Sequence, residues 1–402
     1  MGKSPKEQLE IIKKGTLEII TAKDLENKIK KAIKDKKPLR VKLGIDPTSP
    51  DIHLGFATVL RKLREFQDLG HTAVLIIGDF TAKIGDPTGK KITRPQLSDE
   101  EIKKNMKTYL KQALKILKKD NLEIRYNSEW LKKMNFEKII KLLSKLTIQQ
   151  ILAREDFENR LKENLPIHLH EIIYPIIQGY DSVMLNADIE LGGSDQRFNC
   201  LVGRELQTFF NQEKQVVILM PLLLGTDGRK MSKSYGNYVG ITESANEMFG
   251  KIMSLPDELM EQWFKLCTNL KEKEIKEILN KLHPMQAKKR LAVEIVTLYH
   301  SKEKAEKAKE EFEKIFQKKE IPTENVLETI KLVSSLKNKP LIEILKATKI
   351  FRSNSELKEY LKNGAIEIDS KKIFLDESFK TSLRDEAILK VGKKRFYKII
   401  FE

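Results

Sequence analysis

Residues 41–56 constrain the fold more than any other stretch, because a short apolar strand there runs directly toward a helix. Apolar side chains alternate over 41–45, which is the spacing of a buried strand. Two prolines follow at positions that end a strand. Apolar residues then recur at helical spacing from near His53 to about Gly70, a common type of helix stop. The stretch therefore predicts a strand followed at once by a helix.

A strand that delivers the chain into a helix N-terminus is suited to binding phosphate. Free backbone N–H groups and the positive end of the helix dipole both face the anion there. Ser49 and Asp51 are candidate caps for this helix. Gly44 and Gly55 leave room for a ligand, and His53, expected one turn into the helix, supplies a further donor. A histidine in a purely structural role is the alternative interpretation.

The rest of the chain extends this unit into an α/β fold. The continuous apolar run over 73–77 is typical of a strand buried inside a parallel sheet, and 122–126 and 216–220 are predicted to be further strands. They alternate with helical patterns, and two amphipathic helices are predicted within residues 1–40. This alternation predicts a doubly wound, Rossmann-type parallel sheet.

At 402 residues the chain is long for one hydrophobic core, so more than one domain is expected. Its pattern is helical and rich in Leu and Ile over about 128–173. It is helical and heavily charged from 242 to about 331, and then changes to short strands. We expect a Rossmann-type domain at 1–240 that includes the helical insertion, an α-helical domain at 241–335, and a small α+β module at 336–402.

The composition limits the setting and the partners. A formal net charge of +17 favours an anionic partner such as nucleic acid, although a genome-wide excess of lysine gives the same charge. Cys200 and Cys267 are the only cysteines and lie far apart, so a zinc knuckle and a disulfide framework are not expected, and a reducing, cytoplasmic setting is. No apolar run approaches the ~20 residues of a membrane span, and the N-terminus lacks a signal peptide's apolar core. We expect no membrane association.

Residues 230–234, Lys-Met-Ser-Lys-Ser, form the second informative motif. Its two lysines flank small hydroxyl side chains and follow a turn-forming stretch at 225–229. An exposed basic loop is one interpretation. The other is a mobile lid whose ammonium groups reach a triphosphate as negative charge builds on it.

Together, His53-Leu-Gly55 and residues 230–234 resemble the HIGH and KMSKS signatures of class I aminoacyl-tRNA synthetases, which surround ATP and activate an amino acid as its adenylate. Residues 174–181, 191–196 and 85–90 are similar to segments of the bacterial type of tyrosyl-tRNA synthetase. Taken singly, residues 174–181 would be interpreted as a polar helix edge and residues 191–196 as a turn. The resemblance runs over nearly the whole chain. It implies a tyrosine–tRNA ligase that uses L-tyrosine, ATP with Mg²⁺, and its tRNA.

The resemblance also implies roles for individual residues. The tyrosine-binding residues would be Gly44, Asp86, Tyr174, Gln178, Asp181 and Gln196, with Asp181 accepting a hydrogen bond from the phenolic hydroxyl. The ATP-binding residues would be Asp46, Gly55, Gly193, Asp195, Met231 and Lys233. The catalytic groups around the phosphates would be Thr48, His53, Lys90, Arg94, Lys230 and Lys233. No side chain is predicted to be a metal ligand.

Two positions depart from the family pattern. Lys42 stands where many members have a tyrosine that shares recognition of the phenolic hydroxyl, so the second group that recognises it is unidentified. Phe56 stands where the HIGH signature has its final histidine. A catalytically silent, RNA-binding relative is therefore one alternative, although both lid lysines are present. Tryptophanyl-tRNA synthetase is the other, and the residues at 178–181 and 192–196 argue against it.

The last module and the helical insertion resemble parts of the same family. The module is similar to a small RNA-binding fold shared with certain ribosomal proteins, which implies phosphate contacts that depend on salt. The insertion resembles the segment through which the family forms homodimers, with core packing as the simpler interpretation of its Leu and Ile. The tRNA-binding residues would be Lys349, Arg352, Lys358, Lys393, Lys394 and Arg395.

Overall fold

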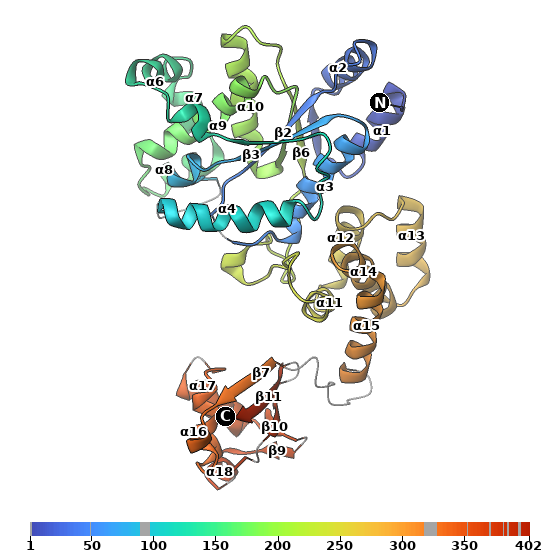
Figure 1. The fold of residues 1–402 in the computed structure, drawn as a ribbon, viewed down its shortest axis with the longest axis vertical. Coiled ribbons are helices and arrows are strands. Elements are labelled where there is room, and N and C mark those ends of the chain that lie inside the picture. The colour runs from blue at the N-terminus through green and yellow to red at the C-terminus, as the bar shows by residue number, and fades with distance from the viewer. Residues whose placement is uncertain are drawn as a thin grey trace. The chain divides into compact units, whose positions relative to one another are not determined.

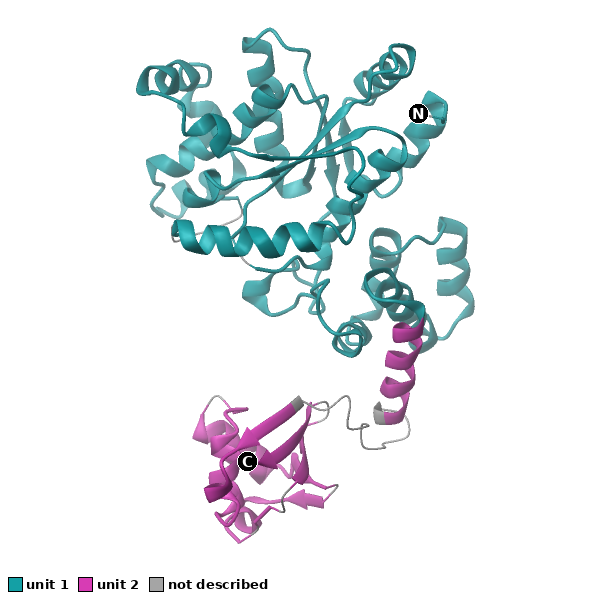
Figure 2. Ribbon diagram, in the orientation of Figure 1, with its two compact units in different colours: residues 1–302 teal, residues 303–402 magenta. Residues whose placement is uncertain are grey.

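The computed structural model describes residues 2–402 except 49, 89–96, 317–327, 352, 370, 381, 384–385 and 393–394. The chain divides into two compact units, residues 1–302 and residues 303–402 (Figure 2). Each unit has its own sheet. The predicted boundaries after residues 240 and 335 divide the chain into three domains rather than two units, and this finer division stays a prediction.

The first unit is built on a six-stranded sheet with the strand order β1-β6-β5-β2-β3-β4. Its strands are β1 (Glu18–Ile20), β2 (Arg40–Ile45), β3 (Thr72–Ile77), β4 (Leu122–Tyr126), β5 (Ile189–Gly193) and β6 (Val216–Met220). All neighbours pair in parallel except β1, which is antiparallel to β6. The doubly wound sheet is confirmed. The two strands that were not predicted are β1, which is short, and β5, whose residues carry two glycines.

The chain direction across this sheet reverses between β2 and β5. From β2 the chain continues outward to β3 and β4, whereas β5 leads the other way to β6. Figure 1 shows α3 (Leu54–Asp68) and α4 (Asp99–Ala113) on one side of the sheet and α10 (Arg197–Phe209) on the other. In such a sheet a crevice opens at the carboxyl ends of the strands where the direction reverses. The functional residues are therefore expected just after β2 and β5.

Further helices surround this core. The two N-terminal helices are α1 (Pro5–Lys13) and α2 (Ala22–Lys34). The predicted helical insertion contains α5 (Ser128–Leu131), α6 (Phe136–Leu143), α7 (Ile148–Leu152) and α8 (Glu155–Lys162), and leads into α9 (Leu169–Leu185). The charged stretch forms α11 (Ala245–Met253), α12 (Met260–Cys267), α13 (Glu272–Lys281), α14 (Pro284–Tyr299) and α15 (Lys302–Phe316). None of the described helices is long and apolar enough to cross a bilayer.

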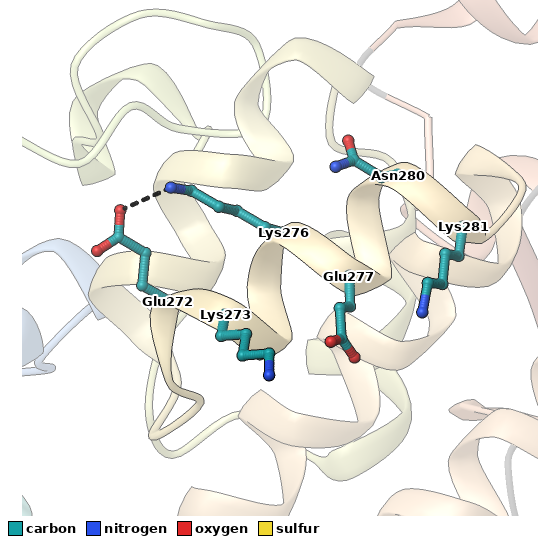
Figure 3. Close-up of a pocket in the computed structure, with 6 residues that line it drawn as sticks. All are labelled: Glu272, Lys273, Lys276, Glu277, Asn280 and Lys281. Carbon is teal, nitrogen blue, oxygen red and sulfur yellow. Dashed lines mark ion pairs between the residues drawn. The ribbon is translucent and has the colours of Figure 1, made fainter.

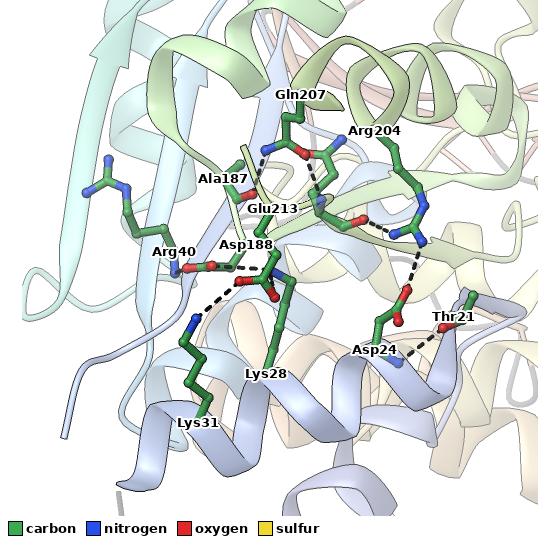
Figure 4. A network of polar contacts seen from close by, with 11 residues as sticks. Thr21, Asp24, Lys28, Lys31, Arg40, Ala187, Asp188, Arg204, Gln207 and Glu213 are labelled. Carbon is green, nitrogen blue, oxygen red and sulfur yellow. Dashed lines mark hydrogen bonds and ion pairs between the residues drawn. The ribbon is translucent and has the colours of Figure 1, made fainter. Parts of the chain in front are cut away.

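A polar network ties α2 to the amino ends of the central strands (Figure 4). Asp188, which directly precedes β5, accepts a 2.9 Å hydrogen bond from the backbone N–H of Arg40, the first residue of β2. Lys28 on α2 lies 3.5 Å from the Asp188 carboxylate and 3.1 Å from that of Glu213. Arg204 on α10 donates to Asp24 on α2 at 2.7 Å. The network holds β2 and β5 in register at the edge opposite the crevice.

The second unit contains a five-stranded sheet with the order β7-β11-β10-β8-β9. Its strands are β7 (Glu328–Leu332), β8 (Ile366–Ile368), β9 (Lys371–Ile373), β10 (Glu386–Val391) and β11 (Arg395–Phe401). The helices α16 (Leu341–Ala347), α17 (Asn354–Lys362) and α18 (Leu375–Ser378) complete the module, and Leu341, Leu357 and Leu389 are among its core residues. The predicted α+β character is confirmed. Because β7 pairs with β11, the sheet begins before the predicted boundary at residue 336.

Candidate active site

A cavity of about 700 Å³ opens at the carboxyl ends of β2, β3 and β5. The two sequence motifs line it together, although they are far apart in the chain. Every predicted tyrosine, ATP or catalytic residue within the described part of the chain borders this cavity. They are Gly44, Asp46, Thr48, His53, Gly55, Asp86, Tyr174, Gln178, Asp181, Gly193, Asp195, Gln196, Lys230, Met231 and Lys233. Lys90 and Arg94 lie outside the described residues.

The helix that follows β2 begins differently from the prediction. Its first residue is Leu54, and His53 is the N-cap, so His53 does not lie one turn inside the helix. The His53 Nδ1 atom accepts a 3.3 Å hydrogen bond from the backbone N–H of Phe56, which serves the role predicted for Asp51 or Ser49. Ser49 is outside the described residues. With Nδ1 as acceptor, a neutral His53 ring carries its proton on Nε2.

The charge state of His53 follows from its surroundings. Burial, followed by the positive charges of Lys233 and Lys230, lowers the pKa of His53 to about 4. The ring is therefore neutral near pH 7. A neutral donor at a helix N-terminus can bind an anion without a proton first being taken up.

The lid is folded back onto this helix. The backbone N–H of Gly55 lies 3.3 Å from the Met231 sulfur, and Leu54 donates to the Val239 carbonyl at 2.8 Å. Lys230 pairs with Asp195 at 2.7 Å. Lys233 donates to the backbone carbonyl of Asp51. Both lysines are thus held at the cavity by protein oxygens, which are acceptors of the same kind as phosphate oxygens.

The lid is the segment of residues 225–237. The side chain of Asn237 holds this segment together, a role that was not predicted. Its side-chain oxygen accepts from the Ser232 backbone N–H at 2.8 Å. Its amide nitrogen donates to the Asp227 carboxylate at 2.7 Å and to the Lys230 carbonyl at 3.1 Å. A Cβ atom at Gly225 would collide with Asn237, so only glycine fits there. A single buried side chain therefore joins both ends of the lid.

Asp46 lies at the centre of the crevice, directly after β2. One carboxylate oxygen accepts from the Tyr174 hydroxyl at 2.8 Å, and the other accepts from Thr81 at 2.7 Å. A Cβ atom at Gly78, directly after β3, would collide with Asp46 and Thr81. The predicted nucleotide side and the predicted tyrosine side of the cavity therefore meet at this carboxylate.

The Asp181 side chain borders the cavity and is buried. It accepts hydrogen bonds from the Trp130 indole at 2.8 Å and from the Asn127 amide at 3.3 Å. Burial raises the pKa of Asp181 to about 7, and the charge of Lys42 together with these two hydrogen bonds opposes the rise. Trp130 lies within the predicted helical insertion, but neither its contact with Asp181 nor that of Asn127 was predicted. The position of Asn127 directly after a predicted strand was the available signal.

Asp86 and Gln196 form the remaining polar wall. The Gln196 amide donates to Asp86 at 2.9 Å, and the Asn199 amide donates to the Gln196 oxygen at 3.0 Å. The other Asp86 oxygen accepts from the Thr88 backbone N–H at 3.0 Å. The wall offers a carboxylate for an ammonium group beside an amide for a carboxylate, which are the two ends of an amino acid.

The predicted tRNA-binding residues are on the second unit. Lys349 and Lys358 are exposed. Arg395 donates to the Tyr360 hydroxyl at 3.0 Å, and its guanidinium lies 5.4 Å from the centre of the Tyr360 ring. Arg352, Lys393 and Lys394 lie outside the described residues.

A second hollow, of about 410 Å³, lies along α13 (Figure 3). It is lined only by exposed side chains of that one helix, such as Lys273 and Glu277. The pair Lys276–Glu272, at 3.6 Å, is a surface ion pair one helical turn apart. The hollow offers no buried polar group to a ligand, so it is not a candidate site.

The chain is similar to known proteins over nearly its whole length. The family model described as class I tRNA synthetases (W and Y) matches residues 34–317. The tyrosine–tRNA ligase of Carboxydothermus hydrogenoformans is 50% identical over 99% of this chain and 98% of its own length. That of Aquifex aeolicus is 48% identical over 99% of each.

Solved structures show the same fold. A mitochondrial tyrosyl-tRNA synthetase from Aspergillus nidulans, truncated at its C-terminus, has a TM-score of 0.64 at 23% identity and covers 78% of this chain and 94% of its own. The enzyme from Archaeoglobus fulgidus, complexed with L-tyrosine, has a TM-score of 0.62 at 23% identity and covers 76% of this chain and 100% of its own.

Proposed function

The chain belongs to the class I tRNA synthetases for tryptophan and tyrosine, its activity is that of a tyrosine–tRNA ligase, and on that premise we propose how its residues carry out the reaction. One observation supports the proposal above the others. The N-terminus of α3, the lid lysines and the acidic pocket of Asp86 and Asp181 border one cavity. A nucleotide and an amino acid held there would have their reacting groups side by side.

In the first step the tyrosine carboxylate attacks the α-phosphorus of ATP, and pyrophosphate leaves. The chemistry needs little acid–base catalysis, so positioning and charge stabilisation dominate. Lys230 exchanges its partner Asp195 for a phosphate oxygen, and Lys233 exchanges the Asp51 carbonyl for another. The neutral His53 donates a hydrogen bond to phosphate from Nε2. Lys90 and Arg94 act on the same phosphates, as the family resemblance implies. Negative charge that grows on the leaving pyrophosphate thus meets fixed donors.

Mg²⁺ enters this scheme with the nucleotide. Among the described residues there is no group of three or more His, Cys, Asp or Glu side chains arranged to hold a metal ion. Mg²⁺ in nucleotide enzymes is bound largely by substrate phosphates and water. The phosphates of ATP would hold the ion, which would neutralise part of their charge.

The amino acid is bound by the other half of the cavity. Asp86, Tyr174 and Gln178 hold the tyrosine ammonium, and Gln196 lies beside its carboxylate. Asp181 accepts from the phenolic hydroxyl. A pocket built around that acceptor disfavours phenylalanine, because the carboxylate then keeps an unpaired lone pair in a buried site.

In the second step a ribose hydroxyl at the 3′ end of tRNA attacks the carbonyl of the adenylate. The described residues of the cavity include no convincing general base for this step, and a substrate phosphate oxygen takes that role. The second unit supplies the tRNA contacts through Lys349, Lys358 and Arg395 and their neighbours. The reaction takes place in the cytoplasm, where the two buried free thiols, Cys200 and Cys267, stay reduced.

We also propose that two copies form a homodimer through the helical insertion. Several apolar side chains there are exposed, with Phe136 and Leu169 each at 76%. Large apolar side chains that are exposed in one segment favour an interface. Sedimentation at micromolar concentration should give a dimer for the intact chain and a monomer for the variant Phe136→Asp/Leu169→Asp. A monomer in both cases would contradict the proposal.

The proposed chemistry has a direct test. The protein should catalyse exchange of labelled pyrophosphate into ATP with tyrosine and not with tryptophan, and no exchange with tyrosine would overturn it. A chain that ends at residue 316 should keep this exchange and lose most charging of tRNA. Full charging by the shortened chain would show that the second unit does not supply the tRNA contacts.

A further inference from the structure

Lys42 and Glu190 form a buried ion pair beneath the cavity, and the mechanism above leaves it without a role. The two residues are direct register partners on the neighbouring parallel strands β2 and β5. The Lys42 ammonium lies 2.8 Å from the Glu190 carboxylate, and the two side chains are 1% and 2% exposed. Both border the cavity. The polar network of Figure 4 holds the same two strands a short distance upstream, at Arg40 and Asp188.

The pair also reaches the helix that carries the tyrosine-binding side chains. The Lys42 ammonium donates to the Ser182 hydroxyl at 2.7 Å and to the Gln178 carbonyl at 3.1 Å. These two residues of α9 flank Asp181 in the sequence. Lys42 therefore connects the strand pair to the segment of α9 that holds the proposed acceptor for the phenolic hydroxyl.

Lys42 does not itself serve as the second hydroxyl-binding group. An ammonium has three N–H groups. Three oxygens, from Glu190, Ser182 and Gln178, already lie within 3.1 Å of it. A direct donor to tyrosine would have to release one of them, so any effect on the substrate is transmitted through α9 and through charge.

Stability alone does not explain a pair in this position. The desolvation of two buried charges offsets much of their attraction, and well-packed apolar residues are often as stable or more so. Ser182 also donates to Glu190 at 3.1 Å, and the Gln215 amide donates to the same carboxylate. The pair is thus a fully hydrogen-bonded unit, which suits a positioning role.

The Asp181 carboxylate lies within reach of the charge on Lys42. The titratable or polar groups that act on it are, by element, Lys42 on β2, Asp46 after β2, Asn127 and Trp130 at α5, and Tyr174 on α9. Burial raises the pKa of Asp181 to about 7, and Lys42 is the strongest influence in the opposite direction. Loss of Lys42 would therefore raise that pKa further.

We propose that the Lys42–Glu190 pair is a positioning unit for tyrosine specificity, which holds residues 178–182 of α9 in place and so fixes Asp181 as the acceptor for the phenolic hydroxyl. The proposal rests on the proposed role of Asp181 in binding that hydroxyl. Many family members have a tyrosine at position 42 that shares recognition of the phenolic hydroxyl. In this protein the Lys42–Glu190 pair contributes to that recognition indirectly, through α9 and Asp181. Lys42 is a positioning residue in this scheme and touches no substrate atom.

The test compares tyrosine and phenylalanine as substrates for pyrophosphate exchange between pH 5.5 and 8.5. For the unaltered protein the ratio of the two kcat/KM values should rise with pH through about 7, as Asp181 loses its proton. The variant Lys42→Met/Glu190→Gln leaves no unpaired buried charge. Its ratio should be at least tenfold lower at pH 7.5, and the midpoint should move to higher pH. An unchanged ratio and midpoint would overturn the proposal.

A matched control separates this role from a general loss of packing. Arg160 and Glu171 form an equally buried pair, 2.8 Å apart, which does not border the cavity. The variant Arg160→Met/Glu171→Gln should keep both the ratio and the midpoint. An equal fall in this control would also overturn the proposal, because it would make the effect structural.

Two further variants keep the outcome decisive. Ser182→Ala removes one partner of Lys42 and leaves the charge, so the ratio should fall three- to tenfold with the midpoint unchanged. If the double variant does not fold, an unchanged ratio in Ser182→Ala overturns the positioning role. Asp181→Asn tests the premise. If Asp181→Asn still discriminates between the two amino acids, the proposed role of Asp181 is wrong. If Asp181→Asn loses discrimination while the Lys42 and Ser182 variants keep it, the role of Asp181 stands and the inference about Lys42 is wrong.

Discussion

The two halves of the cavity for which we propose phosphate binding and tyrosine binding, called the phosphate half and the tyrosine half below, are built in opposite ways. In the phosphate half, Lys230 and Lys233 are carried by a lid, and each has an oxygen partner that substrate phosphate can replace. In the tyrosine half, Asp181 is buried on a helix and already accepts two hydrogen bonds from the protein. The lid lysines change partners when a nucleotide binds, and the donors are then already in place for the charge that develops during reaction. Discrimination between similar amino acids requires groups that do not move.

The largest expected effect is on the phosphate half. Lys233→Ala should lower the rate of tyrosine activation by about 10²–10³-fold, because the lysine acts mainly on charge present in the transition state. The KM for tyrosine should change little. Pre-steady-state formation of the adenylate measures both quantities. Lys251→Ala is the matched control, because this lysine of α11 is paired with Glu243 and does not border the cavity, and it should react normally. Equal losses in rate and tyrosine affinity would contradict the comparison.

The next effect is on the tyrosine half. Asp181→Asn should lower the preference for tyrosine over phenylalanine by about 10–100-fold, because a charged acceptor is replaced by a neutral amide. The value of kcat/KM for phenylalanine should stay within a few-fold of its original value. Competition between the two amino acids in pyrophosphate exchange gives the ratio. A uniform loss with both substrates would show that Asp181 supports the fold rather than selecting the hydroxyl.

A smaller effect is expected at the helix cap. His53→Asn keeps a residue that caps helices well and removes the donor at Nε2. Activation should slow by about tenfold. Because the pKa of His53 is lowered to about 4, the ring is neutral from pH 6 to 8, and the loss should be the same across this range. A loss that disappears toward pH 8 would mean that the protonated ring is the active form.

The smallest effect concerns the lid itself. Asn237→Ala removes hydrogen bonds to Ser232 and Asp227 and should increase the mobility of the loop. Activation should slow by about three- to tenfold, and limited proteolysis within 225–237 should become faster. Tyrosine-against-phenylalanine selectivity should not change. Altered selectivity would show that the two halves are coupled.

The sequence predicted the phosphate half better than the tyrosine half. The strand over 41–45, the helix after it and the lid lysines were recognised from local spacing, since turn residues and helical periodicity act over a few positions. Even there, the cap was assigned to Ser49 or Asp51 and belongs to His53. The choice of cap depends on how the chain leaves the strand, and spacing does not report this.

In the tyrosine half, several contacts were invisible to local patterns. Trp130 was predicted only as part of the helical insertion, yet its indole donates to Asp181 across 51 positions of sequence. β5 was missed as a strand because it carries two glycines, which weaken the apolar signal. Lys42 looked like a departure from the family, and only its partner on β5 suggests a use for it.

The sequence by itself determined the α/β class, the separate C-terminal module and the two motifs that border the nucleotide half of the cavity, because each is written in periodicity or in short runs of residues. The tertiary structure alone decided which buried charges face one another. Strand order brings β5 beside β2, and helix packing brings α9 above both. The strength of a charge interaction depends on distance and burial, and neither is encoded at any single position of the chain.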